Sequence, residues 1–452
     1  MNYYASTTLP PSATHLLYLF GGLFAVLGLF FIFLSPLFRR TFLNGLVVGG
    51  ILLVIAAGFF GFVFYKNASE RTPEVFSRET MLHTIWENYK QSYINTAGRT
   101  VDPDRGDVTT SEGESYSMLR AVWMDDKVAF DQSWQWTKNN LQRNNDHLFS
   151  WLYGKRPDGT YGVLINQGGG NTATDADEDI ALSLTFAYSR WQDEQYLKDA
   201  IAIIPDIWNK EVFMVNGRPY LASQDITNAA PSDSVTIDPS YFAPYAYRIF
   251  ARIDKAHPWF DLIDTSYEIL QKSISTSFGN ETSAGLPPDW LSISRSTGEI
   301  SGIDNASGST RFGFDAIRIP LRITLDWQWY GDPRAKNTLE QLGFLEKEWQ
   351  QKNVIYATYS HSGIPDALYE SPATYGGTIG YFIVQNQNEA DQIYLEKLQA
   401  LFNPDTQTWK APLDYYDANI AWFGMALYNQ ALPNYFILEN PSSTPQLPQN
   451  PS

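Results

Sequence analysis

The chain has 452 residues, of which 44% are hydrophobic and 15% aromatic, and its formal net charge is −17. A chain of this length and apolar content can bury a large core, as one big domain or two ordinary ones, whereas the negative charge would repel nucleic acid and acidic polymers. It has no cysteine, which excludes disulfides and thiolate chemistry, and its five histidines lack metal-binding spacing. We therefore expect no catalytic metal or other cofactor, and a neutral polymer remains compatible as partner.

Two apolar segments near the start, residues 16–38 and 42–65, contain no charged side chain. Each would form a helix long enough to cross a hydrocarbon core about 30 Å thick. A buried core helix is rarely apolar on all sides over such a length, and a signal peptide has a basic start and a shorter apolar stretch. We predict a membrane anchor over residues 1–66, with two transmembrane helices at about 16–38 and 42–65.

The charges around these segments predict their orientation. Arg39 and Arg40 lie in the short connection between the two helices, which the positive-inside rule places in the cytoplasm. Lys66 and Arg71, on the far side of the second helix, weaken this bias. We expect a multi-pass protein of the cell membrane, with the large domain outside the cytoplasm and residues 67–74 as a polar linker.

The remaining chain has the apolar spacing of amphipathic helices. Convincing strands are few, and 355–359 is a short candidate. Helix pairs joined by short turns, with longer aromatic loops between pairs, predict an all-α domain over residues 75–437, arranged as a toroid with its site at one end. A proline-rich, disordered tail is expected over residues 438–452. The helical segments are 80–92, 114–124, 128–142, 177–192, 195–207, 240–253, 259–276, 315–329, 334–350, 376–385, 388–402 and 417–430.

Three acidic residues, Glu112, Asp175 and Asp315, each stand at the start of a predicted helix. Glycoside hydrolysis needs a pair of carboxyl groups that flank the scissile bond, so the three segments together indicate that chemistry. Each acid alone has an ordinary alternative, since any carboxylate near a helix N-terminus is stabilised by the helix dipole.

The acidic run Asp175, Asp177 and Asp179 has a further alternative as a solvated face or a calcium loop. The oxygen-ligand spacing and the downstream Glu of such a loop are missing. We assign Asp175 to function and expect Asp177 and Asp179 to support the start of the helix.

These segments resemble the motifs of glycoside hydrolase family 8, in the family's order. The resemblance covers nearly everything after the predicted membrane helices. One departure is Thr185, which stands in a helix interior where the family usually has an aliphatic residue or Gly. The matching residues are Ser111–Glu112–Gly113 with Tyr116 and Met118, Ala173–Thr174–Asp175–Ala176–Asp177 with Ile180, Ala181 and Trp191, Phe314–Asp315–Ala316 with Arg318, Asp238–Pro239–Ser240–Tyr241–Phe242–Ala243–Pro244, Gly285–Leu286–Pro287–Pro288–Asp289–Trp290, and Tyr416–Asp417 with Asn419.

The resemblance implies an (α/α)6 barrel that hydrolyses β-1,4-linked polysaccharide with inversion. Glu112 matches the family's general acid, and Asp315 matches the general base of its cellulase-type subfamily. Asp175 matches the aspartate that holds and distorts the sugar beside the cut. We expect the neighbouring Glu114 to be solvated or structural.

Five further residues are candidates for substrate binding. Trp151 and Trp290 are predicted as sugar platforms or as core, because flat rings serve both purposes. Tyr241 and Tyr416 are expected to line the cleft. Arg318, one turn after Asp315, either pairs with Asp315 to keep it ionised or forms a surface ion pair.

From the resemblance and the predicted anchor we expect a membrane-anchored inverting endo-β-1,4-glucanase that acts on cellulose. Because it would trim cellulose made by the same cell, a cellulose synthase is a candidate partner. A xylanase or chitosanase would use the same acid and base. A non-catalytic polysaccharide-binding component of a synthesis complex is the alternative of another class, and the presence of both Glu112 and Asp315 argues against it.

Overall fold

The computed structural model describes residues 51, 53, 54, 77–227, 232–303 and 310–436. The chain divides into two compact units, Met1–Ser77 and Arg78–Ser452. The predicted transmembrane helices at 16–38 and 42–65 lie almost wholly outside the described residues, as do the linker at 67–74 and the tail at 438–452. Within the described part of the chain, no helix is both long and apolar enough to span a membrane.

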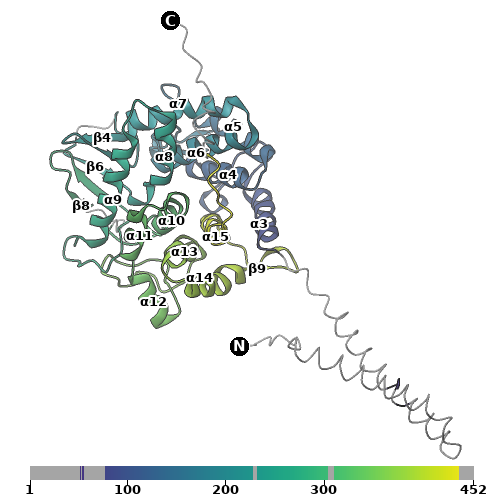
Figure 1. Ribbon diagram of the computed structural model, residues 1–452. Coiled ribbons are helices and arrows are strands. Elements are labelled where there is room, and N and C mark those ends of the chain that lie inside the picture. Colours follow the sequence, from purple (N-terminus) through teal and green to yellow (C-terminus); the bar gives the residue numbers. More distant parts are fainter. Residues whose placement is uncertain (1–50, 52, 55–76, 228–231, 304–309, 437–452) are drawn as a thin grey trace, which may run out of the picture. The chain divides into compact units, whose positions relative to one another are not determined.

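The second unit is a ring of helices in two layers (Figure 1). Helices of the inner and the outer layer alternate along the chain, which is the arrangement of an (α/α)6 barrel, and the predicted all-α toroid is confirmed for the described residues. The inner helices are α4 (Ser111–Trp123), α6 (Thr174–Trp191), α8 (Pro244–Ile253), α10 (Arg318–Tyr330), α13 (Pro372–Gln385) and α15 (Tyr415–Tyr428). The outer layer contains α3 (Arg78–Tyr93), α5 (Lys127–Asn140), α7 (Glu194–Glu211), α9 (Trp259–Ser275), α11 (Pro333–Glu340), α12 (Phe344–Lys352) and α14 (Gln387–Ile393).

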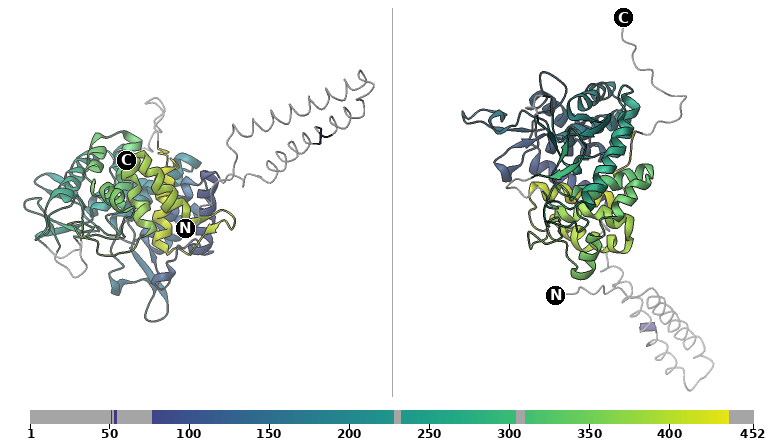
Figure 2. Two further views of the ribbon diagram at one scale, coloured as in Figure 1. Left: turned by 90° about the horizontal axis from the view of Figure 1, so that it is seen from below. Right: turned by 90° about the vertical axis from the view of Figure 1, so that its left-hand side faces the viewer.

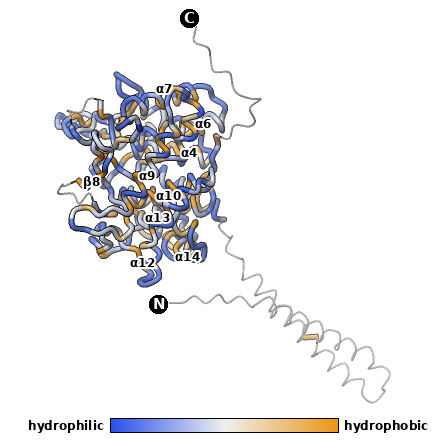
Figure 3. The backbone as a smooth tube through the Cα atoms, turned by 60° about the vertical axis from the view of Figure 1, so that its left-hand side comes forward, coloured by the Kyte–Doolittle hydropathy of each residue, from blue (hydrophilic) through white to orange (hydrophobic). Residues whose placement is uncertain are grey.

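The two layers differ in sequence because they differ in burial. In α4 every residue except Glu112 is buried, whereas α5 and α7 bury only one face. The outermost turns near α7 and α12 are accordingly hydrophilic in Figure 3. Small residues let inner helices approach closely: a Cβ atom on Gly424 of α15 would lie 2.3 Å from the carbonyl oxygen of Gly376 in α13.

Short strands form four small antiparallel sheets in the loops of the described part, more than the sequence led us to expect. The sheets are β1 (Thr109–Thr110) with β2 (Leu152–Lys155) and β3 (Tyr161–Val163); β4 (Val212–Val215) with β5 (Arg218–Leu221); β6 (Ser234–Ile237) with β7 (Leu291–Ser294) and β8 (Ile300–Gly302); and β9 (Phe402–Asn403) with β10 (Thr408–Trp409). Strands of two to four residues carry too little alternation to be recognised. The hairpin of β2 and β3 projects from the ring in Figure 2.

Several predicted helix ranges were wrong. The single helix expected over 334–350 is divided into α11 and α12, and the one over 388–402 is α14 followed by a π-helical turn, Tyr394–Leu398, and a 3-10 turn. The segment 355–359, which is too short for a convincing strand, forms two isolated bridges, both at Tyr359. The helix expected from residue 315 begins at Arg318, so Asp315 lies in the turn before it. This turn is what allows Asp315 to face the site.

Candidate active site

Glu112 sits in the first turn of α4, and backbone contacts fix that turn. The Thr110 hydroxyl caps the helix by accepting from the Gly113 N–H at 3.0 Å, and the Ser111 N–H donates to the Trp151 carbonyl at 3.0 Å. Glycine is required after Glu112, because a Cβ there would lie 2.1 Å from the Tyr415 hydroxyl. The Glu112 side chain is 23% exposed, so the acid is held in place yet open to solvent.

Asp315 is held in a turn that another carboxylate organises. Asp289 Oδ1 accepts from the backbone N–H groups of Gly313 and Ala316, at 2.9 and 2.8 Å. The next residue, Trp290, donates its indole N–H to Asp315 Oδ2 at 2.9 Å. The segment that carries Asp289 and Trp290 therefore sets both the backbone and the side chain of Asp315, which is 31% exposed.

Arg318, the first residue of α10, joins the three predicted catalytic carboxylates. Its Nη1 donates to Glu112 Oε2 at 2.6 Å and to Asp175 Oδ2 at 3.0 Å, and its Nη2 donates to Asp315 Oδ1 at 2.8 Å. The arginine side chain is only 3% exposed. The structure thus brings Glu112, Asp175 and Asp315 to one buried guanidinium. Of the two alternatives for Arg318, it shows the pairing with Asp315 and not a surface ion pair.

Further groups surround the same guanidinium. Nη1 also contacts the Tyr116 hydroxyl at 3.2 Å, and Nη2 donates to the Ser240 hydroxyl at 3.0 Å. Asp238, whose side chain is fully buried, lies 3.8 Å from Nη2. The ring of Tyr241 lies 5.4 Å from the guanidinium carbon. Arg318 is therefore fixed on several sides, so it can act as a rigid template for the acids.

Burial and charge make the two predicted catalytic acids unlike ordinary carboxyls. Burial raises the pKa of Glu112 to about 7; Arg318 opposes this rise, and the neighbouring charges of Asp175 and Asp315 reinforce it. Burial also raises the pKa of Asp315, with Arg318 again opposing. A carboxyl with a pKa near 7 can hold a proton at neutral pH and release it during a reaction.

The predicted aromatic residues have different places. Trp290 packs edge-to-face against Tyr241, with ring centroids 5.9 Å apart, so both belong to the Arg318 cluster. Tyr416 donates its hydroxyl to the Phe314 carbonyl, next to Asp315. The indole N–H of the half-buried Trp151 donates to the Gly168 carbonyl at 3.0 Å, while its backbone supports α4. Their role as sugar platforms stays a prediction.

A cavity of about 430 Å³ opens beside Glu112. Tyr369, which is 54% exposed, and Arg105 belong to its lining, and sequence reasoning missed both. Tyr369 lies in an irregular loop and Arg105 ends a short 3-10 turn, Pro103–Arg105, where no periodicity or motif indicated them. The remaining lining residues are Asp102, Thr110, Phe314, Ser371, Asp414, Tyr415, Tyr416 and Asp417.

Other acids near the motifs have structural contacts. Glu114 is completely buried, and its Oε1 accepts from the Thr100 N–H at 2.7 Å, so it is structural and the solvated alternative was wrong. We expected Asp177 and Asp179 to support the start of α6. Instead Asp177 accepts from the Phe149 N–H at 3.0 Å, and Asp179 pairs with Arg322 at 2.6 Å.

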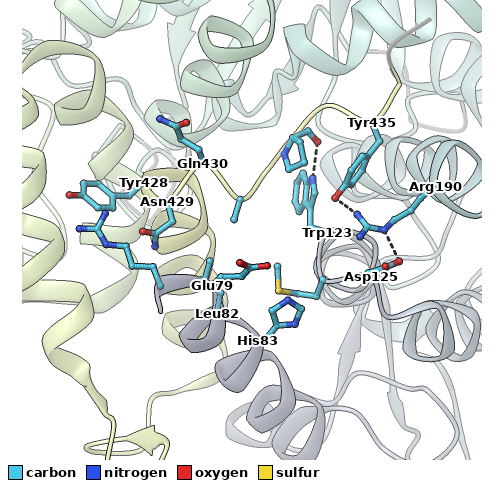
Figure 4. A pocket seen from close by; sticks show the side chains of 14 residues that line it. Glu79, Leu82, His83, Trp123, Asp125, Arg190, Tyr428, Asn429, Gln430 and Tyr435 are labelled. Atoms are coloured by element: carbon cyan, nitrogen blue, oxygen red, sulfur yellow. Dashed lines mark hydrogen bonds and ion pairs between the residues drawn. The ribbon is translucent and has the colours of Figure 1, made fainter. Parts of the chain in front are cut away.

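A larger cavity, of about 810 Å³, lies at the other end of α4 (Figure 4). None of the predicted site residues lines it. Its polar groups are bonded to one another: Arg190 binds Asp125 at 2.7 Å and the Tyr435 hydroxyl, and the Trp123 indole donates to the Pro433 carbonyl. Among the described residues, no group of three or more His, Cys, Asp or Glu side chains could hold a metal ion.

Comparison with known proteins gives matches to one family. The family model of glycosyl hydrolases family 8 matches residues 72–428. Endoglucanase 2 of Ruminiclostridium josui is 31% identical over 291 residues, which cover 62% of this chain and 57% of the relative. A probable endoglucanase of Novacetimonas hansenii is 33% identical over 238 residues, or 52% of this chain and 65% of the relative.

A solved structure is similar over most of the described chain. The endo-β-1,4-glucanase of Acetobacter xylinum matches with a TM-score of 0.61 and 25% sequence identity, over 78% of this chain and 99% of that one. The sequence matches, in contrast, span less than two thirds of the length of the two curated relatives.

Proposed function

The chain belongs to glycosyl hydrolases family 8, and we propose that it is an inverting endo-β-1,4-glucanase that cleaves cellulose-type glucan. The observation that carries this proposal is the convergence of Glu112, Asp175 and Asp315 on the Arg318 guanidinium. Inverting glycosidases need one protonated and one ionised carboxyl in the same cleft. Unequal surroundings of two neighbouring acids are the usual means of obtaining that pair.

Glu112 is the proposed general acid. Because its pKa is raised to about 7, a substantial fraction of the enzyme holds the proton at neutral pH. That proton passes to the glycosidic oxygen as the bond to the anomeric carbon breaks. The negative charge left on Glu112 is stabilised by Arg318, which already lies 2.6 Å away.

Asp315 is the proposed general base. Its Oδ1 accepts from Arg318 and its Oδ2 accepts from Trp290, two interactions that favour the ionised form. The carboxylate takes a proton from a water that attacks the anomeric carbon from the face opposite the leaving group. Glu112 and Asp315 bind different nitrogens of one guanidinium.

Asp175 is the proposed sugar-holding residue. Its side chain is 2% exposed and its Oδ2 accepts from Arg318 at 3.0 Å. A buried carboxylate beside the acid can accept sugar hydroxyls and strengthen those bonds as the ring distorts.

The substrate can be tested with the full-length chain by measuring the reducing ends released from carboxymethylcellulose, xylan and chitosan. We expect the highest rate on carboxymethylcellulose. A higher rate on xylan or chitosan would mean that the enzyme is a xylanase or a chitosanase instead of a cellulase. Activity on none of the three would refute catalysis on β-1,4-linked polysaccharide.

The anomer released first tests the mechanism. NMR of a freshly cleaved β-linked oligosaccharide should show the α anomer first, because a single displacement inverts the configuration. First release of the β anomer would require a covalent intermediate, with carboxyls only about 5–5.5 Å apart, and would remove the base assignment of Asp315.

We also propose that residues 16–38 and 42–65 anchor this domain in the cell membrane, outside the cytoplasm, where it would act beside a cellulose synthase. Support comes from the length of the two uncharged segments and from Arg39 and Arg40 between them. The chain should stay with membranes after carbonate extraction, and protease added to intact spheroplasts should remove the domain. Release by carbonate would refute the anchor, and protection until lysis would reverse its orientation.

A further inference from the structure

A second buried ion pair, Arg322 with Asp179, lies one helical turn away from the pair of Arg318 with Asp175. On α6, Asp179 follows Asp175 by four residues, and on α10, Arg322 follows Arg318 by four. Arg318 Nη1 donates to Asp175 at 3.0 Å, and Arg322 Nη2 donates to Asp179 Oδ2 at 2.6 Å. Residues four apart lie on the same face of a helix, about 6 Å further along. The same two helices therefore carry two stacked ion pairs.

The second pair is enclosed. The side chains of Arg322 and Asp179 are 5% and 4% exposed, and Arg322 Nη1 donates to the Tyr245 hydroxyl at 3.1 Å. A cavity of about 30 Å³ is lined by Arg318, Arg322 and Asp179, and otherwise largely by apolar side chains. In such surroundings a charge interacts with other charges several ångströms away, because little water or salt screens the interaction.

The charged and titratable groups around the second pair come from several helices. Burial raises the pKa of Glu178 well above its usual range, and that carboxyl accepts from the Tyr247 hydroxyl. The other charged groups near the pair are Asp175 and Arg318, which form the ion pair one helical turn away. These groups include Asp175 and Glu178 on α6, Arg318 on α10, Tyr245 and Tyr247 on α8, and Tyr116 on α4.

We propose that Asp179 is a positioning residue for the reaction: by cancelling the charge of Arg322, it sets the pH range in which Glu112 carries its proton. This inference rests on the proposed function. If Asp179 were neutral, the positive charge of Arg322 would no longer be cancelled and would act on Glu112. That charge would favour the ionised form of Glu112 and lower its pKa. A unit charge about 10 Å away, at an effective dielectric constant of about 20, shifts a pKa by about one unit.

Substitutions at the pair test this in the full-length chain. In Asp179→Asn, the high-pH limb of the kcat/KM profile on a soluble glucan should move about one pH unit lower, because the acid loses its proton earlier. In Asp179→Asn with Arg322→Met, both charges are gone and the limb should return to its wild-type place. Replacement of a buried ion pair by groups of similar volume is often tolerated. Asp179→Ser is a second single variant with the same expected shift, should the amide not fold.

A matched control lies further along α10. Asp326 pairs with Arg248 at 2.8 Å and is as buried as Asp179, but it stands two turns beyond Arg318. Asp326→Asn should lower the melting temperature and leave the pH limb in place. If the role of Asp179 were purely structural, both variants would lose thermal stability and neither would shift the pH limb.

The inference is overturned if a folded Asp179 variant keeps the wild-type limb, if the double variant moves as far as the single one, or if Asp326→Asn moves equally. Its failure is distinguishable from that of the proposed function. If the wild-type chain hydrolyses no glucan, the function fails, and the Glu112 titration is then followed by NMR of 13C-labelled carboxyls, which needs no activity. A lower Glu112 pKa in Asp179→Asn would still support the inference.

Discussion

The two ends of α4 show that burial and a shared counter-ion mark the site better than cavity size. At its start, Glu112 shares Arg318 with two other carboxylates, and burial raises its pKa to about 7. Just beyond its end, Asp125 is 58% exposed, and hydrogen bonds from Arg190 and Trp191 lower its pKa. The larger cavity lies at the Asp125 end (Figure 4). Of these two carboxyls, Glu112 is the one whose pKa lies near neutral pH.

The largest effect on turnover is expected when either of the two proposed catalytic acids is replaced. Glu112→Gln and Asp315→Asn should each keep the fold and glucan binding yet lower kcat by at least about 10²–10⁴-fold, which is the usual share of general acid–base catalysis. Asp125→Asn, at the other end of α4, is the matched control and should retain nearly full turnover. Steady-state kinetics on a soluble glucan would decide, and equal losses at both ends would break the comparison.

The shared counter-ion is tested by Arg318→Lys. Lysine keeps the positive charge but presents a single ammonium, which cannot hold Glu112, Asp175 and Asp315 at once. We expect kcat to fall about 10²-fold, since misplacement of catalytic groups by about 1 Å has that effect. Circular dichroism should show an intact fold. If the lysine variant kept wild-type kcat, charge alone would suffice and the template role of Arg318 would be wrong.

A smaller effect concerns pH in the unmodified enzyme. The acid must be protonated, so kcat/KM should fall as pH rises through about 7, approaching tenfold per pH unit above it. Asp125→Asn should leave this limb unchanged. A pH–rate profile from pH 4 to 9 measures both. A flat profile up to pH 9 would mean that the proton comes from a group other than Glu112.

The smallest effect on turnover is expected at Glu114, two residues from the acid. Burial raises the pKa of Glu114 to about 8, so the carboxyl is mostly neutral at pH 7 and Gln is a close substitute. Its folded pKa exceeds the unfolded value of about 4.3, so its stabilising contribution is present at low pH and is lost as pH rises to about 8. Urea unfolding between pH 4 and 8 should therefore show a shallower fall of stability in Glu114→Gln. Identical slopes would contradict the assignment.

Local pattern revealed most of the helices but few of the strands. Helix spacing needs only side chains three and four residues apart, which is why most of the helices could be located from sequence. The hairpin of β4 and β5 was missed although Asn216–Gly217 is a common two-residue hairpin turn, and both residues have positive φ. Pairs of strands this short depend on loops far from them in the chain.

The site was predictable to the extent that it lies in short motifs. Glu112, Asp175 and Asp315 were identified by resemblance, and the structure places them together. The role of Arg318 as their common partner was not predicted, because its contacts run over 206 and 143 residues of sequence. Tyr369 could not have been found, since it lies in a loop whose conformation no local pattern determines.

The guanidinium of Arg318 also has a consequence for the enzyme after each cut. In the proposed mechanism the proton is on Glu112 and the negative charge on Asp315 before reaction; afterwards Asp315 is neutral and Glu112 is ionised. The charge has crossed from Nη2 to Nη1 of one side chain, so no counter-ion has to move. The active site nevertheless leaves each cycle in the wrong protonation state. In this mechanism Asp315 must lose a proton and Glu112 must gain one before the next glucan chain can be cut, so the rate of this recovery would set an upper limit on turnover that is independent of the substrate.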